Sequence, residues 1–278
     1  MTALALLKHI QDSISTIYDT REAANIANYV VVEKYGKLFL RENKQLTKDQ
    51  YDDIEGIIRR LVHHEPVQYV LGKAWFYGLE FKVNNTVLIP RPETEELVDL
   101  LLKENSSKNL TVLDIGTGSG CIAITLKKNR PQWHVNACDI SETALQTASD
   151  NAIRNGVSVN FFQYDIRQPV TTSSRIYDLI VSNPPYIDPS LSHTLDKNVV
   201  AFEPHLALFS PKYDPFFFYK MIVRFAMHNL IKKGRLYFEI PENGCQGITA
   251  ILLDAGFCDV EVYQDMQGKE RMLSGCLA

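Results

Sequence analysis

The hydrophobic positions divide the chain into regions with different periods. In residues 1–74 apolar side chains recur every three or four positions over 3–14, 23–31 and 54–62, which predicts three amphipathic helices. Thr47 and Gln50, three residues apart, match a capping box that opens the third helix. No cluster of reactive side chains accompanies these stripes, so the pattern predicts a small helical domain.

Residues 75–90 follow a strand-like pattern. Alternating apolar positions surround Gly78 and the pair Asn84-Asn85, which predicts a β-hairpin that links two domains and turns at the asparagines. Pro90-Arg91-Pro92 then favours an extended segment, and the helical period resumes over residues 93–103.

From residue 110 onward short buried strands alternate with helices. Strands are predicted over 111–115, 134–138, 159–163, 179–182 and 236–240, with helices such as 142–154 between them. The segments 260–263 and 271–276 resemble two further strands joined by a turn. This alternation predicts an α/β fold with a mostly parallel sheet covered by helices on both faces.

Composition narrows the class of protein. Hydrophobic residues make up 45% and charged residues 22%, which is typical of a globular protein with a buried core. The net charge of −4 argues against a protein that coats nucleic acid. Five cysteines without a CxxC pair favour a reduced cytoplasmic protein, and the histidines lack metal-ligand spacing. No apolar run is long enough to span a membrane and no signal-peptide pattern opens the chain, so we expect a cytoplasmic protein.

A glycine-rich loop follows the first predicted strand of the sheet. Gly116, Gly118 and Gly120 alternate with other residues after Asp114, whereas a dinucleotide-binding fingerprint needs a glycine where Cys121 stands. The acidic-x-Gly-x-Gly-x-Gly form resembles the first motif of Rossmann-like S-adenosylmethionine methyltransferases.

Two aspartates at the ends of the next strands extend this candidate nucleoside site. Asp139, nineteen residues after Gly120, can accept hydrogen bonds from both ribose hydroxyls, and it can equally be the N-cap of the helix that follows. Asp165 can accept from an exocyclic adenine amine, and it can equally be a solvated turn residue.

The fourth strand ends in Asn183-Pro184-Pro185-Tyr186. Two prolines remove two backbone N–H donors, so the loop presents acceptors. The Asn183 side-chain oxygen and the Pro184 carbonyl can each accept one N–H of a planar NH2 group, while Tyr186 packs over the plane. Two acceptors on such a nitrogen aim its lone pair at a methyl donor, which predicts methyl transfer to a planar nitrogen. The alternative is a proline-rich turn with incidental polar neighbours.

These motifs together resemble the HemK/PrmC family of protein-glutamine methyltransferases, nearly end to end. The segments that carry the resemblance are Glu65-Pro66-Val67-Gln68-Tyr69, residues 88–95 (LIPRPETE), residues 114–120 (DIGTGSG), residues 182–187 (SNPPYI) and Phe202-Glu203-Pro204.

The resemblance implies a fold and an activity. The fold would be a Rossmann-like class I methyltransferase domain with a seven-stranded sheet over residues 91–278, a hairpin linker over 75–90, and a helical domain over 1–74 that docks the substrate. The activity would be transfer of a methyl group from S-adenosylmethionine to the side-chain amide nitrogen of the glutamine in the Gly-Gly-Gln motif of class 1 peptide chain release factors. The second product would be S-adenosylhomocysteine.

It also implies site residues. Asn183, Pro184, Pro185 and Tyr186 would hold the glutamine, with Asn183, Pro184 and Tyr186 catalytic. Family members often carry an aromatic residue where Ile166 follows Asp165. The cofactor site expected from the motifs and the resemblance comprises Gly116, Thr117, Gly118, Ser119, Gly120, Asp139, Asp165, Ile166 and Asn183.

Two other functions remain open at this point. DNA adenine-N6 and cytosine-N4 methyltransferases resemble the chain at the same tetrad, but they usually carry a basic target-recognition region, which the sequence lacks. A non-catalytic nucleoside-binding module would be expected to lose the tetrad, which is intact here. Because no apolar stripe is left over, we expect a monomer. The negative net charge and the missing recognition region predict a protein that does not bind DNA.

Overall fold

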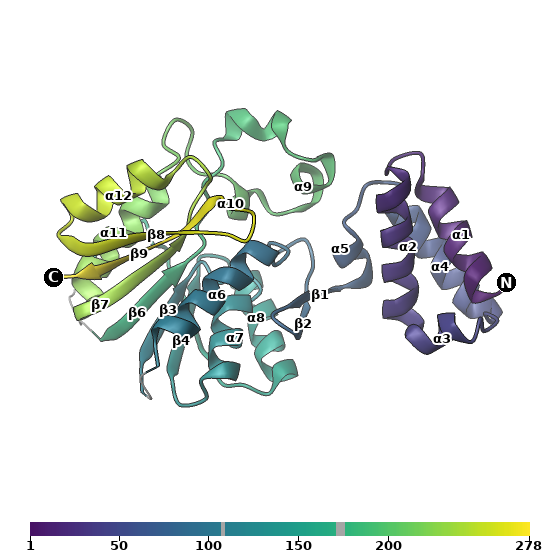
Figure 1. The fold of residues 1–278 in the computed structure, drawn as a ribbon, viewed down its shortest axis with the longest axis horizontal. Coiled ribbons are helices and arrows are strands. Elements are labelled where there is room, and N and C mark those ends of the chain that lie inside the picture. Colours follow the sequence, from purple (N-terminus) through teal and green to yellow (C-terminus); the bar gives the residue numbers. More distant parts are fainter. Residues whose placement is uncertain (107–108, 171–175) are drawn as a thin grey trace. The chain divides into compact units, whose positions relative to one another are not determined.

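The computed structural model describes residues 1–106, 109–170 and 176–278 of the chain. These residues form two compact units, Met1–Gly72 with Asp196–Phe202 and Lys73–Leu195 with Glu203–Ala278 (Figure 1). The smaller unit packs around one hydrophobic cluster, and the larger unit contains two clusters of its own.

The smaller unit is helical. The first, second and fourth of its helices contain the three predicted amphipathic stripes, and Leu6, Ile10, Ile54 and Leu61 are fully buried in its core. The predicted capping box is confirmed, because the side chains of Thr47 and Gln50 each accept a hydrogen bond from the other's backbone N–H. The helices are α1 (Ala3–Ile14), α2 (Thr20–Tyr35), α3 (Lys37–Arg41), α4 (Lys48–Leu61) and α5 (Val67–Leu71), together with α9 (Lys197–Phe202) from later in the chain.

A two-stranded hairpin opens the larger unit. Its strands β1 (Lys73–Phe76) and β2 (Leu79–Lys82) pair antiparallel. The predicted position of the hairpin turn is wrong, because the two strands are joined at Tyr77 and Gly78, with φ of 49° and 74°. Positive φ at both central residues matches the twist of a two-residue hairpin, but tyrosine is an uncommon residue there and gave no turn signal. A turn does form at the asparagines, where the Val87 N–H donates to the Asn84 carbonyl at 3.2 Å, but it lies after β2. Asn84 also accepts hydrogen bonds from the backbone N–H and hydroxyl of Thr86.

The larger unit is built on a seven-stranded sheet in the order β5-β4-β3-β6-β7-β9-β8. Neighbours from β5 to β7 run parallel, and β9 pairs antiparallel with both β7 and β8. The predicted mostly parallel sheet is therefore confirmed. The strands are β3 (Thr111–Ile115), β4 (His134–Asp139), β5 (Asn160–Gln163), β6 (Tyr177–Ser182), β7 (Leu230–Glu239), β8 (Phe257–Gln264) and β9 (Glu270–Leu277).

Strand β7 is longer than predicted. It begins at Leu230, six residues before the expected start at residue 236. The exposed Lys232 and Lys233 interrupt the apolar pattern there, so periodicity alone hid this half of the strand.

Helices cover both faces of the sheet (Figure 1). On one face α6 (Pro92–Glu104), α7 (Cys121–Asn129) and α8 (Glu142–Asn155) pack on side chains such as Val112 and Tyr237. On the other face α11 (Phe217–Asn229) and α12 (Cys245–Asp254) pack on Leu113 and Phe238. Neighbouring residues of one strand thus enter opposite cores, which explains the nearly continuous apolar runs.

The chain order places a switch point between β3 and β6. From β3 the chain winds outward through β4 to β5, and it then crosses to β6 and β7 on the other side. Open α/β sheets bind ligands at the carboxyl ends of the two strands that flank such a point. The glycine loop follows β3 and the Asn-Pro-Pro-Tyr tetrad follows β6.

The segment between β6 and β7 contains short helices. They are η1 (Pro189–Thr194), α9 (Lys197–Phe202) and α10 (His205–Leu208). Among the described residues, no helix combines the length and apolar character needed to cross a membrane.

Candidate active site

The carboxyl ends of β3, β4, β5 and β6 border one cleft in the larger unit. The segments 86–88 and 204–207 and the starts of α8 and α11 also contribute to its lining. The predicted site residues that line it are Gly116, Gly118, Asp139, Asp165, Ile166, Asn183, Pro184 and Pro185. The predicted site residues that lie outside its lining are Thr117, Ser119, Gly120 and Tyr186.

The three glycines of the loop serve two purposes. Gly116 and Gly118 have φ of 74° and 54° and line the cleft, and a Cβ on either would meet no atom within 4 Å. Their bare backbone therefore leaves room for a ligand to approach the main chain. At Gly120 a Cβ would lie 2.7 Å from Ile124 Cδ1, so this glycine is required for packing against α7 and α8.

Thr117 and Ser119 point into the protein. The buried Thr117 hydroxyl donates to Asp114 Oδ2 at 2.7 Å, and the Ser119 carbonyl accepts from Asn151 Nδ2 at 2.9 Å. Burial raises the pKa of Asp114 to about 7. Both side chains are buried, and neither residue 117 nor residue 119 contributes to the lining of the cleft.

Asp139 joins the loop to the end of β4. Its Oδ2 accepts from the Gly118 N–H and its Oδ1 from the Ser141 N–H, both at 2.9 Å. Ser141, whose side chain accepts from Ala144 N–H, is the N-cap of α8, so the helix-cap alternative for Asp139 is excluded. Burial raises the pKa of Asp139, while the backbone donors lower it. A carboxylate has about four acceptor positions, so two remain for hydroxyl groups in the cleft.

Around Asp165 the cleft is bordered by apolar and aromatic side chains. Both Asp165 oxygens are bound by Arg167, at 2.8 Å to Nε and 2.8 Å to Nη2, and this pairing lowers the pKa of Asp165. Ile166 and Tyr164 line the cleft on either side of it. The aromatic residue that is absent after Asp165 is therefore present before it in the chain, a position that the motif did not indicate.

Asn183 belongs to a chain of three hydrogen-bonded side chains. Its Nδ2 donates to Thr94 Oγ1 at 3.3 Å, and the Thr94 hydroxyl donates to Glu239 Oε2 at 2.6 Å. Thr94 and Glu239 are only 3% exposed, so water does not compete for these bonds. The Tyr219 hydroxyl donates to the Glu239 backbone carbonyl at 2.9 Å and fixes the end of β7.

The direction of these bonds fixes the orientation of the Asn183 amide. An ionised carboxylate can only accept, so the single proton of the Thr94 hydroxyl goes to Glu239 and its lone pairs are left for a donor. Only the NH2 end of the Asn183 amide can supply that donor, which leaves the oxygen Oδ1 as an acceptor. Burial raises the pKa of Glu239 from its usual 4.5 to about 7, and the Thr94 bond and Arg271 oppose this shift.

Tyr186 lies behind the prolines. Pro184 and Pro185 line the cleft, whereas the Tyr186 ring packs against the core between the sheet and α11. Burial raises the pKa of Tyr186 to about 12, so its hydroxyl stays protonated near neutral pH. The Ile187 N–H that follows donates to the Leu208 carbonyl at 3.1 Å and anchors the end of the tetrad.

Two of the motifs quoted from the sequence meet at an ion pair. Glu203, whose side chain is 1% exposed, accepts from the Arg91 guanidinium and from the Ile89 N–H. Pro204, next to Glu203, lines the cleft. Glu203 is thereby held against the segment 89–91, more than a hundred residues earlier.

Relatives match this chain along most of its length, and two domain models each match a part of it. A release factor glutamine methyltransferase from Flavobacterium psychrophilum is 40% identical over 270 residues, covering 94% of each chain. The protein of the same name from Bacteroides thetaiotaomicron is 39% identical over 270 residues, covering 96% of this chain and 97% of its own. The PrmC N-terminal domain model matches residues 18–72, and the methyltransferase small domain model matches residues 93–201.

The chain belongs to the release factor glutamine methyltransferase family. The expected family membership and the expectation of a methyltransferase are therefore confirmed. Most of the residues that line the cleft, including those at the ends of the parallel strands, lie within the range that the methyltransferase small domain model matches.

Solved structures share the fold. A methyltransferase from Pyrococcus furiosus matches with a TM-score of 0.54 and 18% identity, covering 78% of this chain and 96% of that one. A human methyltransferase 10 domain containing protein matches with a TM-score of 0.53 and 17% identity, covering 73% and 90%. At this identity the likeness supports the Rossmann-like methyltransferase fold alone.

Several residues in and around the cleft were not predicted from the sequence. Glu239 was not a candidate, and the resemblance implied only that Thr94 lies against the cofactor. Their hydrogen bond was not predicted, because the two residues are 145 positions apart and only the folded chain joins them. Tyr164, Leu206 and Phe218 also line the cleft but were not predicted, because single apolar or aromatic residues form no recognisable motif. The available signal for Glu239 was an acidic residue within the otherwise apolar strand predicted over 236–240.

Proposed function

We propose that the chain transfers the methyl group of S-adenosylmethionine to the side-chain amide nitrogen of the glutamine in the Gly-Gly-Gln motif of class 1 peptide chain release factors. The names of its relatives support the substrate, and the geometry of the cleft supports the chemistry. The observation that carries the proposal is the orientation of the Asn183 amide, whose oxygen is left as an acceptor beside Pro184.

The residues of the cleft fit the cofactor. Gly116 and Gly118 leave open space against the main chain, where a bulky polar ligand can approach. Asp139 has acceptor positions left for the two ribose hydroxyls, and Tyr164 and Ile166 offer apolar surface for the adenine. When bound, S-adenosylmethionine supplies a methyl group on a positively charged sulfur.

Asn183 and Pro184 would hold the glutamine. Its side-chain NH2 donates one hydrogen bond to Asn183 Oδ1 and the other to the Pro184 carbonyl. An amide nitrogen is a poor nucleophile because its lone pair is delocalised into the carbonyl. Two acceptors on its protons favour the geometry in which the lone pair points toward the methyl donor, and they stabilise the positive charge that develops on nitrogen.

A strong base is not required in this arrangement. The nitrogen that has gained a methyl group becomes acidic and releases a proton to water. The Tyr186 hydroxyl, with its pKa raised to about 12, remains protonated and packs behind the tetrad. The catalytic work of this chain is therefore to orient the amide and to stabilise charge.

Residues 1–74 would dock the body of the release factor, with 75–90 as the linker and 91–278 as the catalytic domain of a monomer. The match of residues 18–72 to a separate N-terminal domain model supports this assignment. If docking outside the cleft contributes, KM for an intact release factor will be lower than KM for a short peptide that contains Gly-Gly-Gln. Equal KM values would contradict the docking role.

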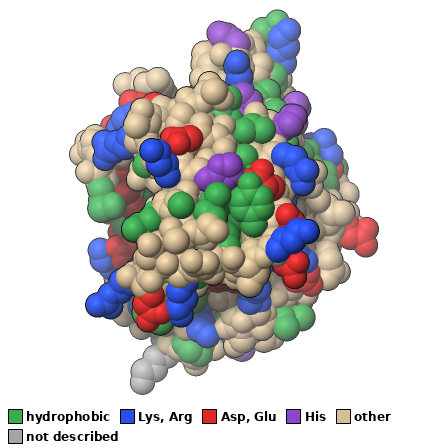
Figure 2. Space-filling model, turned by 90° about the vertical axis from the view of Figure 1, so that its right-hand side faces the viewer, with side chains coloured by type: hydrophobic (Ala, Val, Ile, Leu, Met, Phe, Trp, Pro, Cys, Tyr) green, Lys and Arg blue, Asp and Glu red, His purple; other side chains and the backbone are tan. Residues whose placement is uncertain are grey.

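DNA methylation remains the alternative that the experiment must exclude. On the face drawn in Figure 2, Lys and Arg side chains are interspersed with Asp and Glu and do not gather into one broad basic surface. Binding to duplex DNA depends strongly on such basic surfaces. The names of the relatives give no support to a DNA substrate either.

The test supplies labelled S-adenosylmethionine with one of three acceptors. These are an intact release factor, the same factor with the Gly-Gly-Gln glutamine replaced by alanine, and duplex DNA. We expect label only in the unaltered factor. Label in the alanine variant would place the methyl group elsewhere on the factor, and label in DNA alone would refute the proposal.

A further inference from the structure

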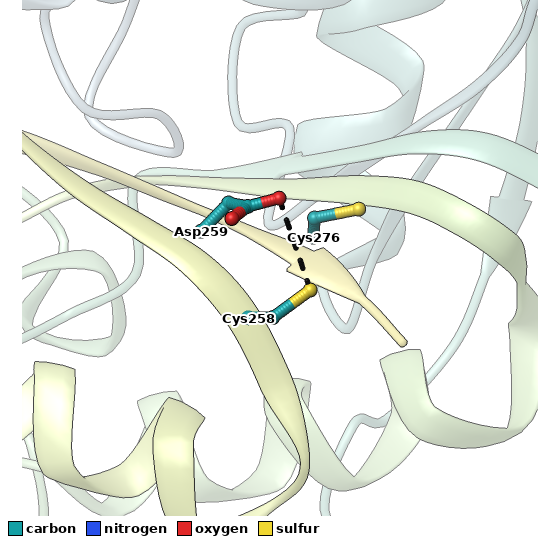
Figure 3. A group of neighbouring side chains, drawn as sticks. All are labelled: Cys258, Asp259 and Cys276. Carbon is teal, nitrogen blue, oxygen red and sulfur yellow. Dashed lines mark hydrogen bonds between the residues drawn. The ribbon is translucent and has the colours of Figure 1, made fainter.

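Three side chains with metal-binding atoms meet at the antiparallel end of the sheet, away from the cleft (Figure 3). Cys258 of β8 lies directly opposite Cys276 of β9, and Cys276 lies opposite Arg235 of β7. Residues opposite one another on neighbouring strands project from the same face. The two thiols are therefore neighbours on one surface of the sheet.

A β-bulge adds a carboxylate to this pair. Between Cys258 and Glu261 the β8 chain advances three residues while β9 advances two, from Cys276 to Ser274. In a regular strand Asp259 would point to the face opposite Cys258. At the bulge Asp259 has φ of 47°, and its Oδ2 lies 3.9 Å from Cys258 Sγ. The extra residue thus turns the carboxylate back toward the thiols.

The separations suit a single small cation. One atom from each of the three side chains lies within 4.8 Å of the others. In a tetrahedral site with metal–sulfur bonds of about 2.3 Å, two sulfurs are about 3.8 Å apart. Side-chain movements of about 1 Å would therefore bring the three ligand atoms to tetrahedral separations. Because Cys258 is exposed, a cation can reach the site from solvent.

We propose that Cys258, Asp259 and Cys276 form a binding site for a thiophilic divalent cation of the Zn²⁺ class. Two thiolates and a carboxylate are a ligand set that such cations prefer, and a water would complete the tetrahedron. Binding converts both thiols to thiolates and releases two protons to the buffer. The neighbouring carboxylate disfavours free thiolates and hence the thiolate attack that forms a disulfide, whereas a divalent cation offsets two of the three negative charges.

The cation would join the edge strand β8 to its neighbour β9. Arg235, beside Cys276, precedes Glu239 by four residues of β7, a distance on the order of 13 Å along a strand. The site is therefore separate from the cleft in which methyl transfer is proposed. Its occupancy is expected to stabilise the β8–β9 pair without supplying any group to that reaction.

The test titrates the reduced, metal-free full-length chain with Co²⁺ and then with Zn²⁺. We expect one Co²⁺ per chain with a near-ultraviolet absorption from thiolate-to-metal charge transfer, which Zn²⁺ abolishes by displacement. Calorimetry in two buffers of different ionisation enthalpy should report the release of about two protons per ion. Cys258→Ser and Cys276→Ser should each weaken binding at least about tenfold, and Asp259→Asn should weaken it while keeping the charge-transfer band.

Cys245→Ser is the matched control, because this half-buried thiol lies outside the cluster. It should leave Co²⁺ affinity and absorption unchanged. The proposal is overturned if the chain binds Co²⁺ without a charge-transfer band, or if Cys245→Ser weakens binding as much as Cys258→Ser. It is also overturned if mild hydroperoxide yields a Cys258–Cys276 disulfide in a chain that binds no Co²⁺ when reduced.

Discussion

The Thr94 hydroxyl is the link through which Glu239 orients Asn183, and Thr94→Val removes it with little change in volume. The variant leaves a buried carboxylate without its 2.6 Å donor and removes the Thr94 acceptor of the Asn183 NH2, which then keeps only its interaction with Glu239. The Asn183 amide can then rotate and present NH2 instead of oxygen to the substrate. We expect kcat to fall while the cofactor site stays intact.

The size of the effect follows from one lost hydrogen bond to a nitrogen that gains charge. Hydrogen bonds that involve a charged group are worth about 1.5–3 kcal/mol. At about 1.4 kcal/mol per tenfold change in rate, this predicts a fall in kcat of roughly 10- to 100-fold. The loss of the Thr94 donor to the buried Glu239 should also lower the free energy of unfolding by about 1–3 kcal/mol.

The assay measures initial rates with labelled S-adenosylmethionine and a release factor, together with cofactor affinity by calorimetry. Thr125→Val is the matched control, since Thr125 is fully buried and its hydroxyl has no hydrogen-bond partner in the described part of the chain. It should keep kcat within about twofold, well under the loss worked out for Thr94→Val. A Thr94→Val variant that folds and keeps wild-type kcat, or that loses cofactor affinity in step with kcat, would refute the reasoning.

Three further predictions concern the cleft. Asn183→Ala should abolish measurable methyl transfer while calorimetry still detects cofactor binding, and substantial residual activity would rule out the proposed acceptor role. Asp139→Ala should weaken cofactor binding at least about tenfold, because two hydrogen bonds to a carboxylate are lost, and an unchanged affinity would exclude the ribose assignment. Since burial raises the pKa of Glu239 to about 7, its carboxylate is ionised only above that pH, so activity should decline as pH falls through about 7. In Glu239→Gln activity should be lower and lack this decline, and an identical pH profile in the two proteins would assign the titration to another group.

The fold could be predicted largely from periodicity. Strands buried on both faces give continuous apolar runs, and these runs located β3, β4 and β6 to within about two residues. The edge strand β5 was located equally closely, but the prediction that it is buried is wrong, because its residues are half-buried or exposed. The position of the hairpin turn was predicted wrongly, because Tyr77 occupies a position with φ of 49°, for which tyrosine has no preference. The first half of β7 was not predicted, because exposed lysines interrupt its apolar pattern.

The candidate site could be predicted only where its residues are adjacent in sequence. The glycine loop and the tetrad each combine local chain geometry with chemistry, and both border the cleft. A motif does not show which way a side chain points, so Thr117 and Ser119 were included although they face inward. The bonds that join Asn183, Thr94 and Glu239 cross three separate segments, and no spacing rule reports them.

The central claim is that Asn183 and Pro184 present a glutamine amide nitrogen to the methyl donor. The most direct measurement is fragmentation mass spectrometry of a release factor after incubation with the chain and S-adenosylmethionine. The account predicts one added methyl group, on the side-chain nitrogen of the Gly-Gly-Gln glutamine, and none with Asn183→Ala. A methyl group on any other residue, or on that glutamine with the Asn183→Ala variant at the wild-type rate, would contradict it.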